Sequence, residues 1–210
     1  MIIIEPSVYI EQMPTQEEAL AMLERAGRVC YKSEHRITEG SAERFVNTII
    51  SLGHESVLEH VSASVRIVCD RGVSHELVRH RIASYSQEST RYCNYSNERF
   101  GGEITFIRPF YYEEGSKELD VWEKAMDFSE RYYFKLLKMG SSPQEARAVL
   151  PNSLKTEIIA TMNLREWRHF FTLRLSKKAH PQMVQIASLI FDQFEERIPL
   201  LVKDIVTKIH

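Results

Sequence analysis

The stretch Val61-Ser62-Ala63-Ser64-Val65-Arg66-Ile67-Val68-Cys69 has an apolar side chain at every second position and mostly polar side chains between them. A period of two is typical of a β-strand with one buried face. Residues 70–72 form a turn sequence, and residues 73–80 are predicted to be helical. A strand followed directly by a helix indicates a fold that combines both element types.

The chain before this strand contains a helix with its own start signal. Thr15 followed by Glu18 forms a capping box, in which two side chains satisfy backbone N–H groups reciprocally. We expect this helix to run to about Arg25, with Gly27 as its terminator. The same periodicities and caps predict the remaining elements. Strands are expected at 2–4, 104–107 and 156–162. Helices are expected around 45–52, closed by Gly53; at 117–139, ended by Gly140; from Ser142, with Glu145 as its capping partner; from Leu164, capped by Asn163 with Glu166; and from Pro181 to a break at Pro199.

Length and composition bound the fold. The chain has 210 residues, of which 43% are hydrophobic, and this is enough for a sizeable core. Because no repeats or linkers divide it, we expect one domain that spans residues 1–210. The predicted elements give the fold class, which is α+β: a helix-rich domain around a small, mainly antiparallel sheet.

The overall charge argues against a nucleic-acid partner. Lysine and arginine total 27 against 29 acidic residues, which gives a net charge of -2. A nucleic-acid binder carries a basic excess, and this chain does not. Positive charge must therefore act locally.

Cysteine usage and the N-terminal sequence predict a cytoplasmic protein. Cys30, Cys69 and Cys93 are an odd number and lack CxxC spacing. The first six residues lack the basic and long apolar regions of a signal peptide, and no apolar run reaches the length of a membrane span. We therefore expect no membrane contact.

Positive charge is concentrated in one short segment, Arg79-His80-Arg81-Ile82-Ala83-Ser84-Tyr85-Ser86-Gln87-Glu88-Ser89-Thr90-Arg91-Tyr92. Its three arginines carry planar guanidinium groups that match phosphate or carboxylate oxygens, and its hydroxyl side chains add neutral donors. The composition predicts a site for an anion. A solvated, salt-bridged loop is the alternative interpretation.

A metal site is a second hypothesis for the histidines. The possible ligands are His54, Glu55, Glu59, His60, His75 and His80. The helical zinc-protease pattern needs a second histidine four residues after the first, and that position is Leu58. We therefore expect no metal and interpret the histidines as structural.

Ser89 could be interpreted as a nucleophile. A serine needs an adjacent base to accept its proton, and no histidine lies close to Ser89 in the segment. Donation of a hydrogen bond to a substrate phosphate is the favoured interpretation.

The order of residues in this segment resembles the signature of the flavin-dependent thymidylate synthases. The pattern Arg-His-Arg-x-x-Ser-x-x-x-x-Ser-x-Arg is filled by Arg79, His80, Arg81, Ser84, Ser89 and Arg91. The similarity continues in the same order on both sides of the segment, at 53–56 and 59–60, then at 147–151, 163–165 and 173–175. It therefore extends over most of the chain.

The resemblance implies an enzyme that methylates deoxyuridine monophosphate (dUMP) at C5 to give thymidylate (dTMP). In this family 5,10-methylenetetrahydrofolate supplies the carbon, FAD reduced by NADPH supplies the hydride, and the enzyme contributes no nucleophile. The protein then supplies position and charge, while the cofactor supplies the redox chemistry. The resemblance also implies a homotetramer whose active sites are shared between subunits.

The resemblance assigns roles to individual residues. Arg174 is implied to be catalytic, because it would stabilise negative charge on the pyrimidine ring. The residues implied to bind cofactor are His54, Ser56, Arg79, His80, Arg81, Gln87, Asn163, Leu164, Arg165 and His169. The residues implied to bind dUMP are Glu76, Arg79, Gln87, Glu88, Ser89, Thr90, Arg91, Arg147 and Arg174.

The chain departs from the family pattern at two positions, and this leaves their hydrogen-bond roles open. Gln87 stands where the family often has glutamate, and Glu76 stands where it often has glutamine. Two other functions are compatible with the sequence. One is an enzyme of the same fold with another nucleotide substrate; the other is a non-catalytic nucleotide- or RNA-binding protein that uses Arg79–Arg91 and stacks bases on Tyr85 and Tyr92.

Overall fold

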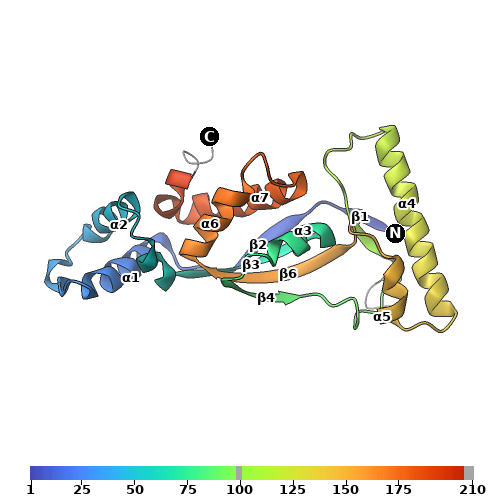
Figure 1. Cartoon of the computed structure of the whole chain (residues 1–210), viewed down its shortest axis with the longest axis horizontal. Coiled ribbons are helices and arrows are strands. Elements are labelled where there is room, and N and C mark those ends of the chain that lie inside the picture. The colour runs from blue at the N-terminus through green and yellow to red at the C-terminus, as the bar shows by residue number, and fades with distance from the viewer. Residues whose placement is uncertain (98–100, 206–210) are drawn as a thin grey trace. The chain divides into compact units, whose positions relative to one another are not determined.

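The computed structural model describes residues 1–97 and 101–205, and its helices and short strands confirm the α+β class (Figure 1). None of the described helices is long and apolar enough to cross a membrane. The strands are β1 Ile2–Ile4, β2 Ser7–Gln12, β3 Ser62–Asp70, β4 Ala83–Gln87, β5 Thr105–Ile107 and β6 Lys155–Asn163. The helices are α1 Gln16–Val29, α2 Ser41–Ser51, α3 Arg71–Leu77, α4 Lys117–Lys138, α5 Pro143–Ala146, α6 Leu164–Arg174 and α7 Pro181–Arg197, with 3-10 turns at Glu34–Arg36, Glu55–His60, Arg147–Val149 and Pro199–Leu201.

The strands form two small sheets. Four strands are hydrogen-bonded in the order β2-β3-β6-β4. The remaining two, β1 and β5, pair in parallel, with Ile3 opposite Phe106. The strand content is therefore small, as predicted, and it includes this parallel pair.

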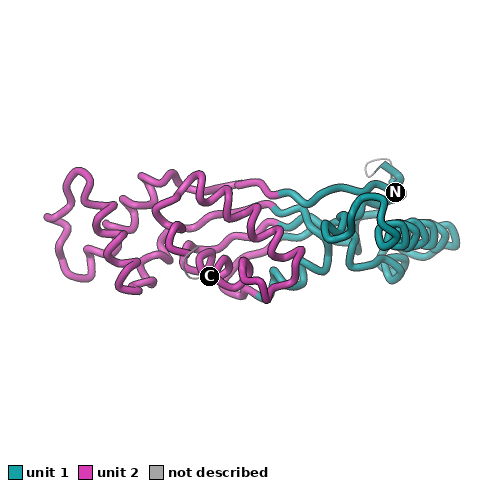
Figure 2. The backbone as a smooth tube through the Cα atoms, turned by 90° about the horizontal axis from the view of Figure 1, so that it is seen from above, with its two compact units in different colours: residues 1–7, 67–79, 86–158 teal, residues 8–66, 80–85, 159–210 magenta. Residues whose placement is uncertain are grey.

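The chain divides into two compact units (Figure 2). Unit 1 comprises residues 1–7, 67–79 and 86–158, and unit 2 comprises residues 8–66, 80–85 and 159–210. Strands β3, β4 and β6 each contribute residues to both units. The expectation that residues 1–210 form one domain stays a prediction.

Unit 1 has a core under helix α4. Met126 and Tyr133 on the inner face of α4 belong to the same buried cluster as Ile104, Phe106 and Leu154. Glu130, on the same face, accepts a hydrogen bond from the backbone N–H of Ile104 and pairs with the N-terminal ammonium. The buried carboxylate of Glu130 thus has a partner at each of its two oxygens.

Unit 2 has an aromatic core between α6 and α7. Trp167 and Phe171 on α6 each pack against Phe194 of α7 with ring centroids 5.2 Å apart. Phe170, also on α6, packs against Trp167 at 5.5 Å and Phe171 at 5.6 Å. All four rings are fully buried. The Trp167 indole N–H donates to the backbone carbonyl of Ala63 at 3.1 Å, so the polar atom of the largest core residue has its partner.

The start and stop signals read from the sequence are mostly confirmed. The Thr15 and Ser142 capping boxes are both present, and the Asn163 side chain accepts a hydrogen bond at the start of α6. The glycines predicted to end two helices, Gly53 and Gly140, have positive φ. Pro199 follows the end of α7, as predicted.

The prediction that Gly27 ends the first helix is wrong, because α1 continues to Val29. A Cβ atom at Gly27 would lie 2.5 Å from Cζ of Phe45, which is closer than real side chains pack. The glycine is therefore needed for close approach between α1 and α2, and it does not terminate the helix.

Two further predictions around the arginine-rich segment are corrected. The helix predicted at 73–80 begins at Arg71, directly after Asp70, which caps it, and ends at Leu77, so Arg79 and His80 follow it. Residues 83–87, expected to be loop, form strand β4, in which half-buried and exposed positions alternate. The period of two was hidden because the alternating residues are mostly polar. Strand β2 was also not predicted.

We predict that Gly27→Ala destabilises the protein. Overpacking costs about 1–3 kcal/mol, and at the middle of that range it exceeds by about 1 kcal/mol the roughly 1 kcal/mol that alanine contributes over glycine inside a helix. The midpoint of thermal unfolding should fall by about 2–4 °C. In a Phe45→Leu background the clash is absent, and the same substitution should then be neutral or stabilising. An equal loss in both backgrounds would show that the ring is not the cause.

Candidate functional site

His80 is the buried centre of a polar cluster in unit 2. Its side chain is 4% exposed, and its ring packs edge-on against Phe170 at 5.1 Å between centroids. The backbone carbonyl of His80 accepts a hydrogen bond of 2.8 Å from the Tyr85 hydroxyl. Burial raises the pKa of Tyr85 to about 12, so this hydroxyl remains a donor at neutral pH. The Tyr85 hydroxyl therefore holds the backbone of His80, and packing against Phe170 holds its ring.

The two ring nitrogens of His80 contact two residues of α6. Nδ1 lies 3.1 Å from Oε1 of Glu166, which is in the first turn of the helix. Nε2 lies 3.0 Å from Nε of Arg174, the last residue of the helix. The position of Glu166 is fixed in turn by Asn163, whose side chain accepts a hydrogen bond from the Glu166 backbone N–H at 2.9 Å.

These contacts determine the protonation state of His80. The Nε–H of Arg174 can only donate, so Nε2 of His80 must accept and carries no proton. The proton of the neutral ring is then on Nδ1, where it donates to the Glu166 carboxylate. Burial and the charge of Arg174 lower the pKa of His80, and the hydrogen bond to Glu166 opposes them. The imidazole is therefore a neutral link between a carboxylate and a guanidinium.

A metal ion does not fit this cluster. Potential ligand atoms of His80, Glu166 and His169 lie within 4.8 Å of one another. A cation would have to displace Glu166 or Arg174 from His80, and the Arg174 guanidinium disfavours a second positive charge. The expectation of no metal stays a prediction.

The other residues implied to bind cofactor are mostly at the surface of unit 2. His54, Ser56, Arg81 and His169 are exposed, whereas the Leu164 side chain is fully buried. Arg165 pairs with Glu59 at 2.7 Å and with Glu55 at 3.7 Å. A cavity of about 530 Å³ is lined by Glu55, Glu59, Ile82, Asn163, Arg165, Glu166, Arg168, His169 and Thr172.

Unit 1 contains most of the residues implied to bind dUMP. Arg147 Nη1 donates to the buried Thr90 hydroxyl at 3.0 Å, and Ser89 Oγ accepts from the Arg91 backbone N–H at 3.3 Å. The guanidinium of Arg91 lies over the Tyr92 ring. Arg79, Arg91 and Arg147 are exposed, and Glu76 is half-buried. The structure thus brings Arg147 to the arginine-rich segment across a long sequence separation.

The two positions that depart from the family pattern have different surroundings. Gln87 donates from Nε2 to the hydroxyls of Ser74, at 2.9 Å, and Thr156, at 3.1 Å. Its neighbour Glu88, which is also implied to bind dUMP, accepts from Lys155 at 2.9 Å and from Tyr95 at 3.0 Å. Glu76, by contrast, accepts the Arg79 backbone N–H through its own carbonyl. The Gln87 amide is therefore anchored within unit 1.

Sequence reasoning missed three residues of these clusters: Glu166, Tyr85 and Lys155. Glu166 was interpreted only as a helix-capping residue, although it sits at a position that also faces His80. Tyr85 was considered only for base stacking. Lys155, at the start of β6, carries no local pattern that indicates its partner Glu88.

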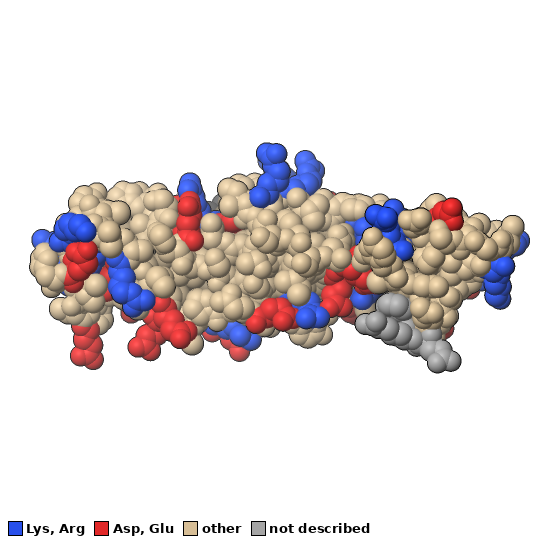
Figure 3. Space-filling model, turned by 90° about the horizontal axis from the view of Figure 1, so that it is seen from below, with Lys and Arg blue, Asp and Glu red and all other residues tan. Residues whose placement is uncertain are grey.

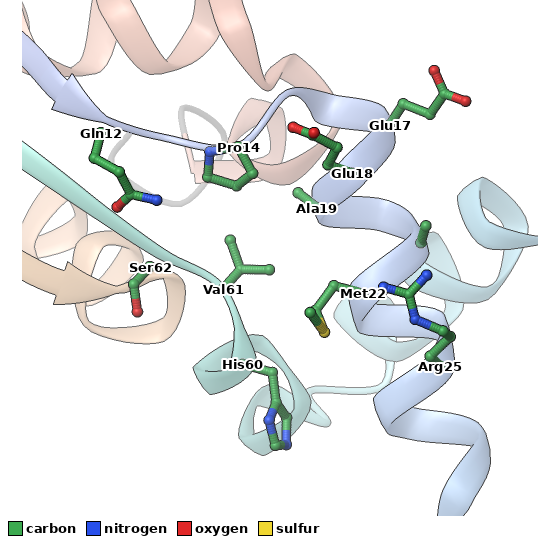
Figure 4. Close-up of a pocket in the computed structure, with 11 residues that line it drawn as sticks. Gln12, Pro14, Glu17, Glu18, Ala19, Met22, Arg25, His60, Val61 and Ser62 are labelled. Carbon is green, nitrogen blue, oxygen red and sulfur yellow. The ribbon is translucent and has the colours of Figure 1, made fainter.

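A second cavity in unit 2, of about 520 Å³, lies between α1, the end of β2 and the start of β3 (Figure 4). Apolar Met22 and Val61 line it together with charged Glu17, Glu18 and Arg25. None of the residues that line it belongs to the sets implied to bind cofactor or dUMP. The cavity and the His80 cluster therefore have no residue in common.

Comparison with known proteins points in one direction. Residues 10–200 match the family described as thymidylate synthase complementing protein. The chain is 36% identical over 178 residues to the flavin-dependent thymidylate synthase of Pyrococcus furiosus, covering 84% of this chain and 72% of that protein. Proteins of the same name match from Geobacter sulfurreducens (38% over 185 residues, 85% and 77%) and Mycolicibacterium vanbaalenii (34% over 202 residues, 88% and 78%).

We predict that the stability contributed by His80 decreases in acid. The folded-state pKa of His80 lies below the ordinary 6.5, so below pH 6.5 the unfolded chain binds a proton that the folded chain does not. The free energy of unfolding of the wild type, relative to His80→Gln, should therefore shrink between pH 7.5 and pH 5.5 in urea titrations. If acid left this difference unchanged or enlarged it, His80 would be a charged partner of Glu166.

Proposed function

Since the chain belongs to the thymidylate synthase complementing protein family, we propose that it is a flavin-dependent thymidylate synthase. In this reaction dUMP, 5,10-methylenetetrahydrofolate, NADPH and a proton give dTMP, tetrahydrofolate and NADP⁺. The observation that supports it best is the position of Arg174, which the resemblance implies to be the catalytic arginine. Arg174 is held by the histidine of the arginine-rich segment, which is itself held by Glu166.

The residues of unit 2 fit a flavin. A dinucleotide cofactor needs cationic and neutral donors for its diphosphate and ring, and Arg81, His54 and Ser56 offer these at the surface. We propose that these residues, with Asn163, Leu164, Arg165, His169, Arg79, His80 and Gln87, form the cofactor site. When bound, FAD supplies the hydride after its reduction by NADPH. Leu164 could contribute only through its backbone, since its side chain is buried.

The residues of unit 1 fit a nucleoside monophosphate. A phosphate needs fixed cations and short donors, and Arg91, Arg147, Ser89 and Thr90 combine both. We propose that they bind dUMP together with Glu76, Arg79, Gln87 and Glu88. The contact between Arg147 and Thr90 holds the guanidinium before the substrate arrives, and such pre-organisation lowers the entropy lost on binding.

We propose that Arg174 stabilises the negative charge that develops on the pyrimidine as C5 becomes nucleophilic. A guanidinium does this best when its orientation is set before the reaction. His80 sets it through Nε of Arg174, and Glu166 sets the tautomer of His80. Glu166 and His80 would therefore be positioning residues.

No thiol of the chain is needed as a nucleophile. Cys69 is fully buried, and burial raises its pKa, so it is held as the unreactive thiol. Cys30 and Cys93 form no disulfide, and neither lies in the sets proposed above. The proposed roles of the chain's residues are to bind and orient FAD and dUMP and to stabilise the charge that develops on the pyrimidine.

The proposed enzyme is a cytoplasmic homotetramer with active sites shared between subunits. Three cysteines that form no disulfide suit a reducing compartment. The alternative, a nucleotide- or RNA-binding protein, would be favoured by a continuous basic surface. On the face shown in Figure 3, Lys and Arg side chains of the described residues are interspersed with Asp and Glu. We therefore favour the small-molecule substrate.

The purified protein should retain FAD or bind it on reconstitution, and NADPH should bleach the flavin absorbance under anaerobic conditions. With dUMP and 5,10-methylenetetrahydrofolate it should then form dTMP, measured by chromatography. An enzyme that binds FAD and is reduced but methylates another nucleotide would contradict the substrate. A colourless protein with salt-dependent affinity for single-stranded RNA would favour the binding-protein alternative.

We predict that Arg174→Lys separates cofactor reduction from methyl transfer. Lysine keeps the charge but lacks both the planar fork and the Nε–H that contacts His80. The variant should bind FAD and be reduced by NADPH, while single-turnover dTMP formation falls on the order of 10²–10³-fold. Arg131→Lys, at the surface of unit 1, is the matched control. Near wild-type turnover by both Arg174→Lys and Arg174→Ala would contradict the catalytic role.

A further inference from the structure

Both carboxylate oxygens of Glu88 are hydrogen-bonded to side chains of unit 1. Oε2 accepts from Nζ of Lys155 at 2.9 Å, and Oε1 accepts from the Tyr95 hydroxyl at 3.0 Å. The side chain of Glu88 is 15% exposed and that of Lys155 is 23% exposed. A carboxylate with so little access to water stays charged only if a cation and donors stabilise it, and Glu88 has both. Its carboxylate is therefore part of the packing of unit 1.

Strand β6 holds Glu88 at two points. Lys155 is the first residue of β6, and the carbonyl of Glu157, two residues later, accepts the Glu88 backbone N–H at 2.8 Å. Buried and half-buried positions alternate along β6, so Lys155 and Glu157 share its half-buried face, where Nζ also lies 3.6 Å from Oε2 of Glu157. Glu88 directly follows β4, which is hydrogen-bonded to β6. The end of β4 is thus fixed through both the backbone and the side chain of Glu88.

Tyr95 connects Glu88 to the core under α4. It is 7% exposed and belongs to that core cluster, where its ring centroid lies 5.8 Å from that of Tyr133. Burial and the negative charge of Glu88 raise the pKa of the Tyr95 hydroxyl, so it remains a donor at neutral pH. The Glu88 carboxylate therefore joins the first residue of β6 to the core of unit 1.

The residues between Glu88 and Tyr95 form a tight turn. The carbonyl of Ser89 accepts the backbone N–H groups of Tyr92, at 3.1 Å, and of Cys93, at 2.9 Å. Three of the residues proposed to bind dUMP lie in this turn: Ser89, Thr90 and Arg91. Because Glu88 precedes the turn and Tyr95 follows it, the hydrogen bond between their side chains closes the turn at its base. Ordering the turn in this way lowers the entropy that a ligand loses when it binds there.

Charge gives Lys155 a second effect. A nucleotide phosphate carries about two negative charges near neutral pH, and a carboxylate beside it is repelled. Glu88 is adjacent in sequence to Ser89, so its carboxylate opposes phosphate binding at this turn unless a cation neutralises it. The ammonium of Lys155 is that cation.

We propose that Lys155 and Tyr95 are positioning residues for dUMP that act through Glu88. They fix the base of the turn, so that its hydroxyls and the Arg91 guanidinium are in place before the nucleotide binds. The Glu88 carboxylate serves as their anchor and does not contact the phosphate. This inference rests on the proposed function, because it concerns the binding of that enzyme's substrate.

Tyr95→Phe tests the anchor by removing only a hydroxyl from a core ring, so the variant should fold and retain FAD. Its dissociation constant for dUMP, measured by isothermal titration calorimetry of the FAD-loaded protein, should rise about three- to tenfold. Turnover at saturating dUMP should stay within about threefold of wild type, since the reacting groups are unchanged. Tyr133→Phe is the matched control. The Tyr133 hydroxyl is buried in the same core without a hydrogen-bond partner among the described residues, so its removal should leave dUMP affinity unchanged.

Lys155→Met tests the charge. It leaves the Glu88 carboxylate without its cation, so the dissociation constant for dUMP should rise at least about tenfold. Lys155→Arg keeps the cation and should bind dUMP within about threefold of wild type. Lys124→Met, which breaks the exposed ion pair with Asp120 on α4, is the matched control and should leave dUMP affinity unchanged.

Wild-type dUMP affinity in Tyr95→Phe, and in Lys155→Met if that variant folds, would overturn the inference even if the thermal midpoint fell, because the contacts would then serve stability alone. Lower turnover at saturating dUMP with unchanged affinity would overturn it as well. A wild-type protein that binds FAD but no dUMP would instead contradict the proposed function.

Discussion

The buried imidazole of His80, held between the Glu166 carboxylate and the Arg174 guanidinium, is the constraint on which the account of unit 2 depends. Burying polar groups is unfavourable unless each has a partner, and here each ring nitrogen has one. The arrangement allows only one tautomer of His80. Nδ1–H therefore donates to Glu166, and Nε2 accepts from Arg174. It also joins the arginine-rich segment to both ends of α6. Arg174 is consequently oriented by the fold.

The two units separate the implied site residues by their role. Eight of the ten residues implied to bind cofactor belong to unit 2, and eight of the nine implied to bind dUMP belong to unit 1. Arg174 is the exception in the substrate set, and it is the residue proposed to act on the pyrimidine. Each unit therefore carries a chemically coherent set: donors for a flavin in one, and donors for a nucleotide phosphate in the other.

Sequence signals that act within a few residues predicted local structure well. Features that depend on contacts between residues far apart in the sequence were missed. Capping boxes at Thr15 and Ser142 act within four residues, so the sequence alone reveals them. Gly27 was misread because its reason is Phe45, a contact between two helices. Strand β4 was missed because its alternation is carried by polar residues, and Glu166 was assigned only to a cap because its partner His80 is 86 residues away. The family motif identified the site residues without such contacts, whereas their positioning partners were visible only in the structure.

The central claim is that His80 is neutral, with its proton on Nδ1. Neutron diffraction from a deuterated crystal at pH 7.5 tests this most directly, because it locates deuterium on each ring nitrogen. We predict deuterium on Nδ1 of His80 facing Glu166, deuterium on Nε of Arg174, and none on Nε2 of His80. Deuterium on both ring nitrogens, or on Nε2 alone, would contradict the account, because Arg174 could not then be oriented by donating to His80.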